Sequence, residues 1–317
     1  MRTSRGLILY SRGLLKTKEN ALIAPESITV VLPVHSRKQL TISCLHSLFR
    51  QHISGFKVIV VDSGSMDGTA DAVEAEFPNV IVLRHGNLWW TGATNKGVER
   101  ALVDGAKYIL TINDDLEFPG NYLEAMSEAA ASHPLAIMGS YALNLDTKEP
   151  MYCGERMNWV TAKRSSLLDI IPPQNRHGLL KVSYFSARGL WLPAEVFSRI
   201  GLFDAKHLPH YVADHEFTAR AANVGFDVYV NCDAVLYNRR DYLGPRNNLK
   251  HFSWKNFRKH LFSIQGGGNL KNFTVFAFQS CPRRYLPLFW IMGISRCIGG
   301  YLREWLMSKM PRQHLCR

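Results

Sequence analysis

The chain has 317 residues, of which 46% are hydrophobic and 20% charged, a composition that excludes a mainly disordered protein and allows one large or two smaller domains. Its 38 Lys and Arg residues exceed its 26 Asp and Glu residues, and the resulting net charge of +12 favours an anionic partner. Because no zinc-finger spacing, RNA-recognition signature or basic zipper is present, we do not expect nucleic acid to be that partner.

The cysteine pattern and the N-terminal stretch both bear on the compartment. Six cysteines are scattered along the chain without a CxxC pair, which is typical of reduced thiols in the cytoplasm. The first residues, MRTSRGLILYSRGLLK, contain only the short apolar run GLILY, whereas a signal peptide needs a longer run and a cleavage site. We therefore expect a cytoplasmic protein.

Short apolar runs alternate with amphipathic stretches from residue 28 to about residue 120. Buried strands are predicted for ITVVLPV (28–34), FKVIVVDSGS (56–65), NVIVLRHG (79–86) and KYILTINDD (107–115). Helices are predicted for QLTISCLHSLFRQ (39–51), DGTADAVEAEF (67–77) and TNKGVERALVDGA (94–106). Strands that alternate with helices predict a parallel sheet with right-handed crossovers.

The second half of the chain is less regular. Residues 149–178 predict a connecting excursion over the sheet, ended by a Pro-Pro pair. A strand and a short helix are expected within 182–204, and a helix followed by a strand within 214–230. After Tyr242 the sequence becomes rich in basic and aromatic residues.

Each of the first four predicted strands ends in a polar cluster. These clusters read HSR, DSGS, GNLWW and NDD in chain order. Because the ligand of such a sheet sits at the carboxyl ends of its strands, we expect the four clusters to form one site.

The NDD cluster carries two adjacent carboxylates, Asp114 and Asp115. Adjacent carboxylates repel each other unless a cation or several donors offset their charge, and oxygen ligands suit Mg²⁺ or Mn²⁺. Alternatively, one of the two caps a helix starting near Pro119. Asp62, at the end of the second strand, accepts a hydrogen bond from a base N–H or caps the following turn.

A histidine-rich segment surrounds a further acidic pair, Asp214 and Glu216. Mixed donors in this segment suggest a transition metal, but the spacing of His207, His210 and His215 does not match a zinc helix motif. Local hydrogen bonding is the favoured interpretation of these histidines.

Five elements, taken in order, resemble the family 2 glycosyltransferases of GT-A fold, which transfer a sugar from a nucleotide-sugar donor with inversion. VVLPVHSR resembles the first strand and base-contacting loop, and VIVVDSGSMDGTAD is similar to the family's VDNGSTDGT. NLWWTGATNKG resembles NxGfagaxNxG, and NDD stands at the DxD-type motif. GLFDAKHLPHYVADHEFTARAANVGFDVYV resembles GxFDE…EDxdlclRaxxaGy. The resemblance covers about two thirds of the chain, from Ile28 to Tyr237.

The resemblance implies an α/β GT-A fold, with a single Rossmann-like, mixed and mostly parallel sheet flanked by helices. It implies an N-terminal extension over residues 1–26 and a catalytic domain over 27–245. A basic and aromatic helical region over 246–317 would follow as a C-terminal extension.

Roles for individual residues also follow from the resemblance. Donor-binding roles are implied for Pro33, His35, Arg37, Asp62, Trp89, Trp90, Asn95, Lys96, Asp114 and Glu216. Among these, Asp62 would contact a pyrimidine and Asp114 would lie near the ribose. Asp115 would bind the divalent cation, Mg²⁺ or Mn²⁺, that bridges the diphosphate. Asp214 matches the catalytic base.

Two positions depart from the family pattern. Asn113 replaces the first aspartate of the DxD-type motif, so Asp115 is expected to carry most of the metal binding. Asn238 stands where many relatives have a histidine that joins the metal or the diphosphate. Arg239, Arg240 or Arg246 could supply positive charge to the diphosphate instead.

The paired tryptophans, Trp89 and Trp90, stand in a stretch with the composition of an exposed loop. We expect one ring to pack and the other to line the site, where it would stack on a sugar or exclude water. This paired aromatic form most resembles the rhamnosyltransferase-type members, so dTDP-rhamnose is the first donor to consider and another nucleotide sugar the second.

The predicted reaction is a metal-assisted in-line displacement onto a hydroxyl of a glycan or lipid-linked saccharide. A sugar nucleotidyltransferase would need a glycine-rich loop after the first strand, and an oxidoreductase would need GxGxxG there; both are absent. A non-catalytic nucleotide-sugar or polysaccharide-binding protein is the remaining alternative. Turnover of the donor with and without metal separates it from an enzyme.

The C-terminal run YLPLFWIMGISRCIGGYLREW is too short between charges to predict a membrane span. As a helix it would place Arg296, Gly299 and Arg303 on one face and its aromatic residues on another. Together with the basic segment 250–259, this pattern predicts a helix at the inner membrane surface. The alternatives are packing on the catalytic domain and a homodimer contact.

Overall fold

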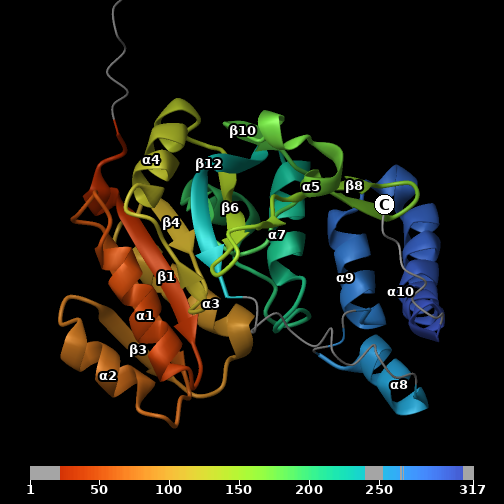
Figure 1. Cartoon of the computed structure of the whole chain (residues 1–317), viewed down its shortest axis with the longest axis horizontal. Coiled ribbons are helices and arrows are strands. Elements are labelled where there is room, and N and C mark those ends of the chain that lie inside the picture. The colour runs from red at the N-terminus through yellow and green to blue at the C-terminus, as the bar shows by residue number, and fades with distance from the viewer. Residues whose placement is uncertain (1–21, 240–252, 265, 267, 310–317) are drawn as a thin grey trace, which may run out of the picture.

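A mixed sheet forms the centre of the computed structural model, which describes residues 22–239, 253–264, 266 and 268–309 (Figure 1). Its strands lie in the order β10 (Leu179–Lys181), β12 (Val228–Asn238), β6 (Ile137–Asn144), β11 (Leu190–Pro193), β4 (Tyr108–Thr111), β1 (Ile28–Val34), β2 (Lys57–Ser63) and β3 (Ile81–His85). Strands β1 to β4 are parallel, and β11 is antiparallel to both β4 and β6. The expected parallel unit is therefore present, and the antiparallel strand β11 joins it to β6, β12 and β10.

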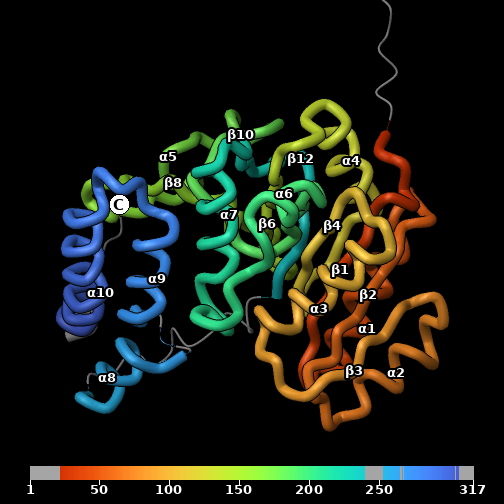
Figure 2. Tube along the Cα trace, turned by 180° about the vertical axis from the view of Figure 1, so that it is seen from behind, coloured from red at the N-terminus to blue at the C-terminus, as the bar shows by residue number. Residues whose placement is uncertain are grey.

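Helices cover both faces of this sheet, and a separate apolar core lies on each side. The core on one face includes residues of α1 (Lys38–Phe49) and α4 (Tyr122–Ser132). The other includes residues of α3 (Trp89–Val103), α6 (Glu195–Ile200) and α7 (Ala213–Asn223), which lie on the near side in Figure 2. All seven residues of β1 are buried, which explains why its sequence is apolar except at Thr29.

Smaller elements complete the catalytic unit. They are α2 (Thr69–Glu76), β5 (Leu116–Glu117), β7 (Pro150–Tyr152), the hairpin β8 (Glu155–Asn158) and β9 (Lys163–Ser166), and α5 (Leu167–Ile170). Strand β5 pairs with the end of β12, and β7 pairs with β6. The predicted excursion over residues 149–178 therefore contains short strands of its own.

Helix α3 begins at Trp89, five residues before the predicted start, so the tryptophans open a helix and the prediction of a loop there is wrong. Tertiary bonds explain the early start, because Thr91 N donates to Pro209 O at 3.1 Å and Thr91 Oγ1 to Leu208 O at 2.7 Å. Gly97 lets this helix approach the sheet, since a Cβ there would lie 2.3 Å from Val31 Cγ1.

Three helices follow the catalytic unit: α8 (Trp254–Phe262), α9 (Leu270–Ser280) and α10 (Leu286–Lys309). Helix α9 packs on α7, where Asn223 Nδ2 donates to Ser280 O at 2.7 Å. Helix α10 packs on α9 and α8; its Tyr301 lies against Phe257, with ring centroids 5.2 Å apart. Among the described residues, no helix is long and apolar enough to cross a membrane.

One of the two predicted segment boundaries, between residues 245 and 246, lies outside the described residues. Residues 1–21 and 240–252, which include the 245/246 boundary, Arg240 and Arg246, are not among the described residues. Five cysteines are described and all five are free thiols; Cys153 and Cys232 are the pair whose sulfurs approach to 3.7 Å.

Candidate active site at the strand ends

The loops after β1 and β2 are tied to each other by hydrogen bonds. His35 Nδ1 lies 2.8 Å from Ser63 O, and Ser36 N donates to Ser65 Oγ at 2.8 Å. Lys38 N donates to Asp67 Oδ2 at 2.9 Å. The two loops therefore form one polar rim at the carboxyl ends of their strands, while Pro33 stays buried within β1.

Asp62 lies at this rim and is only 6% exposed. Its Oδ1 accepts a hydrogen bond from Ser65 N at 2.9 Å, so the side chain caps the turn after β2. The turn-capping interpretation is therefore correct as far as Oδ1 is concerned. A carboxylate has further acceptor positions, so capping does not prevent contact with a base N–H.

Burial makes both carboxyls of the acidic pair after β4 harder to ionise than a free aspartate. Burial raises the pKa of Asp114 to about 6, a shift that Arg37 opposes through an ion pair of 3.0 Å and that Asp115 increases. Burial also raises the pKa of Asp115, against the positive charges of Arg188 and Arg37. Two carboxyls that resist ionisation together are electrostatically suited to a cation.

Unpaired buried polar atoms beside the acidic pair fit such a cation. Within the described part of the chain, Oδ1 of Asp115 and both amide atoms of Asn238 are buried without a hydrogen-bond partner. The two residues are neighbours, because Asn238 pairs with Leu116 across β12 and β5. Carboxylate and amide oxygens are ligands of Mg²⁺ and Mn²⁺. Among the described residues, no group of three or more His, Cys, Asp or Glu is arranged to hold a metal ion by itself.

The two tryptophans have different environments. Trp90 is half-buried, packs edge-on against Phe203 at 5.9 Å and donates from Nε1 to Asn113 Oδ1 at 3.1 Å. Trp89 is 38% exposed and its ring lies 5.8 Å from that of His210. Trp90 thus supports the segment that carries the acidic pair, whereas Trp89 presents an accessible ring.

Asp214 lies in the first turn of α7 with a fixed carboxylate. Its Oδ2 accepts from Ala187 N at 2.9 Å and its Oδ1 accepts from His215 N at 2.9 Å. Arg188 follows Ala187 and was not among the predicted site residues. The signal in the sequence is a cation directly before a glycine, Gly189. In the structure this position requires glycine, because its φ is +66° and a Cβ there would lie 2.4 Å from Ser140 Oγ.

Electrostatic coupling links Asp214 to the acidic pair. Burial lowers the pKa of the half-buried His210, while Asp214 raises it and Arg37 lowers it further. Arg37 is also the ion-pair partner of Asp114. Arg188 lowers the pKa of Asp115. Burial raises the pKa of Tyr152, Asp214 raises it further, and Arg188 opposes this rise. Arg37 therefore acts on groups of both acidic segments, whereas Arg188 acts on Asp115 and is linked to Asp214 through the N–H of the preceding residue, Ala187.

Backbone strain is concentrated around this cluster. Five non-glycine residues in the described part of the chain have positive φ, and three of them are Ser36 (49°), Trp89 (55°) and Val212 (77°). These residues follow β1, begin α3 and precede α7. Since such conformations cost of order 1–3 kcal/mol each and gather at functional sites, the strain supports a site at this position.

Three predicted donor-binding residues have structural roles. Glu216 is fully buried and pairs with Arg220 Nε at 2.6 Å, so the expectation that it contacts the donor is wrong. Asn95 exchanges two hydrogen bonds with the backbone of Phe203, at 2.8 and 3.1 Å, which occupies its amide. Lys96 is exposed and pairs with Glu99 at 2.8 Å. In the histidine-rich segment, local hydrogen bonding is seen at His207, whose Nδ1 lies 2.7 Å from Asp204 Oδ2.

Removal of Arg220 should test the structural role of Glu216. Arg220→Met should reduce the free energy of unfolding by about 3–5 kcal/mol, because Glu216 would be left buried without its partner. Arg220 also donates to Leu202 O at 3.0 Å and to Ile200 O, and those bonds would be lost as well. Urea denaturation measures the change. The double variant Arg220→Met, Glu216→Leu should recover part of it, and a single-variant loss below about 1 kcal/mol would contradict this role.

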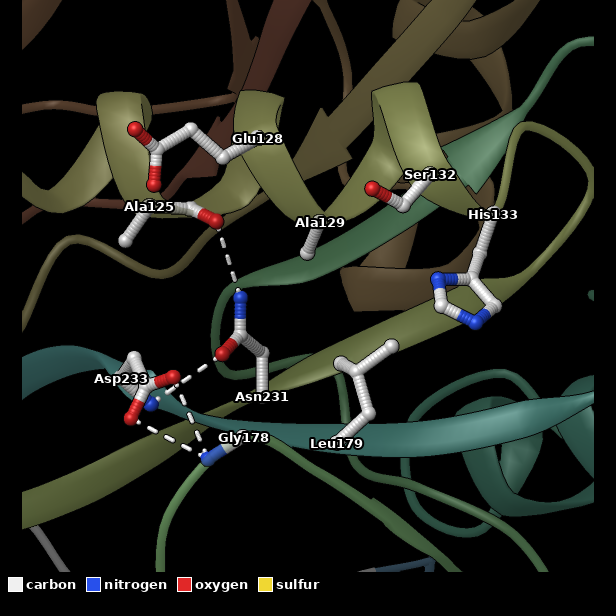
Figure 3. A pocket seen from close by; sticks show the side chains of 9 residues that line it. All are labelled: Ala125, Glu128, Ala129, Ser132, His133, Gly178, Leu179, Asn231 and Asp233. Atoms are coloured by element: carbon white, nitrogen blue, oxygen red, sulfur yellow. Dashed lines mark hydrogen bonds between the residues drawn. The ribbon is translucent and has the colours of Figure 1, made fainter. Parts of the chain in front are cut away.

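A cavity of about 250 Å³ between α4 and the strands β10 and β12 is unrelated to the cluster (Figure 3). None of its lining residues is a predicted site residue. Its polar groups already bond to each other and to the backbone: Asn231 Nδ2 donates to Ala125 O, and Asp233 accepts from Gly178 N. We do not assign it to the donor.

Comparison with known proteins decides the family. The model of the family described as "Glycosyl transferase family 2" matches residues 29–187, half of the chain and the whole span from β1 to Ala187. The chain belongs to glycosyl transferase family 2. This glycosyltransferase is 23% identical over 295 residues to an uncharacterised glycosyltransferase of Rickettsia typhi, covering 86% of this chain and 87% of the relative.

A second relative of this glycosyltransferase has a named activity. It is the N-acetylglucosaminyl-diphospho-decaprenol L-rhamnosyltransferase of Mycobacterium tuberculosis, 25% identical over 236 residues that cover 65% of this chain and 73% of the relative.

Solved structures share the fold of this glycosyltransferase. The mannosyltransferase PcManGT of Pyrobaculum calidifontis, in complex with GDP-Man and Mn²⁺, has a TM-score of 0.54 at 15% identity, covering 90% of this chain and 76% of its own. S. aureus TarS 1–349 has a TM-score of 0.53 at 14% identity, covering 87% and 91%. The predicted GT-A fold, with its mixed sheet and C-terminal helices, is confirmed.

Proposed function

We propose that the protein transfers a sugar, with inversion, from a nucleotide-sugar donor to a hydroxyl of a glycan or lipid-linked saccharide. The observation that carries the proposal is that each of two arginines is linked to both acidic segments. Arg37 pairs with Asp114 and lowers the pKa of His210. Arg188 acts on Asp115 and directly follows Ala187, whose N–H donates to Asp214. A donor-side carboxyl, Asp115, and an acceptor-side carboxyl, Asp214, are the two groups that an inverting displacement requires.

The donor would lie along the polar rim. Asp62 would accept from the N3–H of a pyrimidine, and His35 belongs to the loop beside it. Arg37 and Arg188 would neutralise part of the diphosphate charge. Among donors, dTDP-rhamnose is the first to test, because the M. tuberculosis relative is named an L-rhamnosyltransferase.

The residues that would hold a divalent cation are Asp115, Asp114 and Asn238. Two of the solved neighbours are described with Mn²⁺, and the unpaired Asp115 and Asn238 atoms fit such an ion here. A bound Mg²⁺ or Mn²⁺ would stabilise the charge of the leaving diphosphate. No protein acid is then needed on the leaving-group side.

Asp214 would act as the base. The hydrogen bonds from the backbone N–H groups of Ala187 and His215 hold its carboxylate in one orientation and leave acceptor positions free for the acceptor hydroxyl. As the sugar carbon is attacked, the hydroxyl proton passes to Asp214 and the nucleoside diphosphate leaves from the opposite side.

A screen of nucleotide sugars by thermal unfolding tests the function directly. A cognate donor should raise the unfolding temperature in the presence of Mn²⁺, and EDTA should reverse most of the shift. Incubation of that donor with candidate acceptors should then release the nucleoside diphosphate. Absence of stabilisation by every nucleotide sugar, with and without metal, would contradict the proposal.

Stabilisation by Mn²⁺ should depend on pH. Since the pKa of Asp114 is raised from 3.8 to about 6, the folded protein keeps a proton that the unfolded chain releases between about pH 4 and 6. Without metal, this carboxyl therefore contributes stability that is complete below about pH 4 and lost as the pH rises through 6. A cation needs the ionised form, so the Mn²⁺-induced shift in unfolding temperature should grow from pH 5 to pH 7. A shift that is constant over this range would be the contrary result.

The tryptophans should separate kinetics from stability. Trp90→Ala should lower the free energy of unfolding by about 2–4 kcal/mol, because it removes a packed ring and the bond to Asn113. Trp89→Ala should cost less than about 1 kcal/mol yet raise the KM for the donor. Trp90→Phe, which keeps the packing but loses the indole N–H, is the control. If neither alanine variant changes donor kinetics, both rings only pack.

A further inference from the structure

The excess of basic over acidic residues lies in the C-terminal region of the chain. Residues 246–317 contain 13 Lys and Arg residues and a single acidic residue, Glu304, which gives a net +12. That value equals the formal net charge of the whole chain, so residues 1–245 are neutral overall, with 25 basic and 25 acidic residues. The catalytic unit therefore does not account for the expected anionic partner.

Helix α8 presents part of this charge together with exposed aromatic rings. Trp254 is 75% exposed and Phe262 is 65% exposed. Lys255, Arg258 and Lys259 are exposed on the same helix, which contains no acidic residue. We call these five residues the basic aromatic face.

The opposite side of α8 anchors it to the protein. Leu261 is buried, and Phe257 and His260 lie against Tyr301 of α10 with ring centroids 5.2 and 5.1 Å apart. Ser253 caps the helix, accepting from Asn256 N at 3.0 Å. The helix is therefore already formed and held on this side.

The position of α8 relates it to the catalytic cluster. In both Figure 1 and Figure 2, α8 lies at the lower end of the molecule, the end towards which β1 and β12 run. The carboxyl ends of these strands carry the site. Helix α8 therefore lies on the side of the molecule towards which these strands run, although it is displaced from β1 along the long axis.

We propose that the basic aromatic face docks on the surface of a bilayer containing anionic lipids. An amphipathic helix with Lys and Arg beside Trp and Phe is the chemistry that binds the interface, because the rings enter the headgroup boundary while the cations contact lipid phosphates. A second copy of the chain would bring an equally basic region against this one, which is electrostatically unfavourable. Nucleic acid would match the cations, but the sequence contains no zinc-finger spacing, RNA-recognition signature or basic zipper.

The docking would bring the strand ends to the membrane, where a lipid-linked saccharide presents its hydroxyl. Only this consequence rests on the proposed function; binding to vesicles does not require donor, acceptor or metal. Failure of vesicle binding and failure of sugar transfer are therefore separate results.

Sedimentation of the full chain with lipid vesicles tests the proposal. The protein should bind vesicles of phosphatidylcholine mixed with phosphatidylglycerol, and should bind pure phosphatidylcholine at least ~tenfold more weakly. The variant Lys255→Glu, Arg258→Glu, Lys259→Glu should lower the partition coefficient on the mixed vesicles by at least ~tenfold. Trp254→Ser, Phe262→Ser should also weaken it, and the weakening should persist at high salt, where charge is screened.

A matched triple reversal is the control for net charge. Lys57→Glu, Lys107→Glu, Arg156→Glu changes the charge equally at exposed positions outside the C-terminal helices, and it should leave binding within ~twofold. Circular dichroism and thermal unfolding of each variant, without any ligand, show that it is folded. Equal binding to neutral and mixed vesicles, unchanged binding by the α8 reversal, or tight binding of an oligonucleotide in place of vesicles would each overturn the proposal. So would self-association in the ultracentrifuge that the serine variant abolishes.

Discussion

Replacing Asp214 by asparagine should reduce the rate of sugar transfer by ~10³-fold while leaving donor affinity within about threefold of the unchanged protein. Asparagine has nearly the same shape and its amide oxygen can still accept from Ala187 N, so the start of α7 should be preserved. The asparagine amide cannot take a proton from the acceptor hydroxyl, because it is not a base at neutral pH. Initial rates at saturating donor and calorimetric titration of the donor measure the two quantities separately.

The control for this variant makes the same chemical change directly before β12. Asp227→Asn alters a surface carboxylate paired with Lys181 and should leave transfer unchanged. If Asp214→Asn keeps more than about a tenth of the original rate, Asp214 is not the base. If it loses donor binding instead, the carboxylate belongs to the donor side of the site.

Replacing Asp115 by asparagine should abolish the metal-dependent part of nucleotide binding. The buried Oδ1 has no hydrogen-bond partner among the described residues, so its loss should cost little stability while it removes an anionic ligand. We expect the affinity for a nucleoside diphosphate in the presence of Mn²⁺ to fall by at least ~100-fold, measured by calorimetry. The effect on transfer should be as large.

Two comparisons make the Asp115 result specific. Asp104→Asn, which changes a carboxylate paired with Arg100 at the end of α3, should keep metal-dependent binding. Nucleotide binding in EDTA should be the same for Asp115→Asn and the unchanged protein. If Asp115→Asn binds the nucleotide in Mn²⁺ as tightly as the unchanged protein does, this residue does not belong to the metal site.

The sheet and its site edge were predictable because the signals for them are local. ITVVLPV is apolar at every position except Thr29 because β1 is buried on both faces, and the polar residues that follow it mark the strand end. The same holds for the runs that form β2 and β4. The carboxyl ends of parallel strands converge by geometry, so HSR, DSGS and NDD could be placed together without a structure.

The details that the sequence did not predict depend on contacts between distant segments. The early start of α3 rests on bonds from Thr91 to residues 208 and 209. The antiparallel insertion of β11 between β4 and β6 cannot be read from a four-residue run. Arg188 stands alone in the sequence, and only the bond between Ala187 and Asp214 shows that it lies at the site.

Glu216 shows how a motif position can mislead. Its place two residues after Asp214 predicted contact with the donor, yet helical geometry turns it towards Arg220, four residues further along. Burial raises the pKa of Glu216, and Arg220 opposes that rise. The pairing stabilises the helix that carries the proposed base, so Glu216 supports the site from inside the core.

The central claim is that Asp115 and Asp214 face the same bound donor, and diffraction at the manganese absorption edge tests it most directly. Crystals of the full chain grown with Mn²⁺ and dTDP should show the ion bonded to an Asp115 oxygen, with the diphosphate lying between that ion and Asp214. Manganese and nucleotide bound elsewhere, or a diphosphate at Asp115 from which Asp214 points away across the sheet, would contradict it.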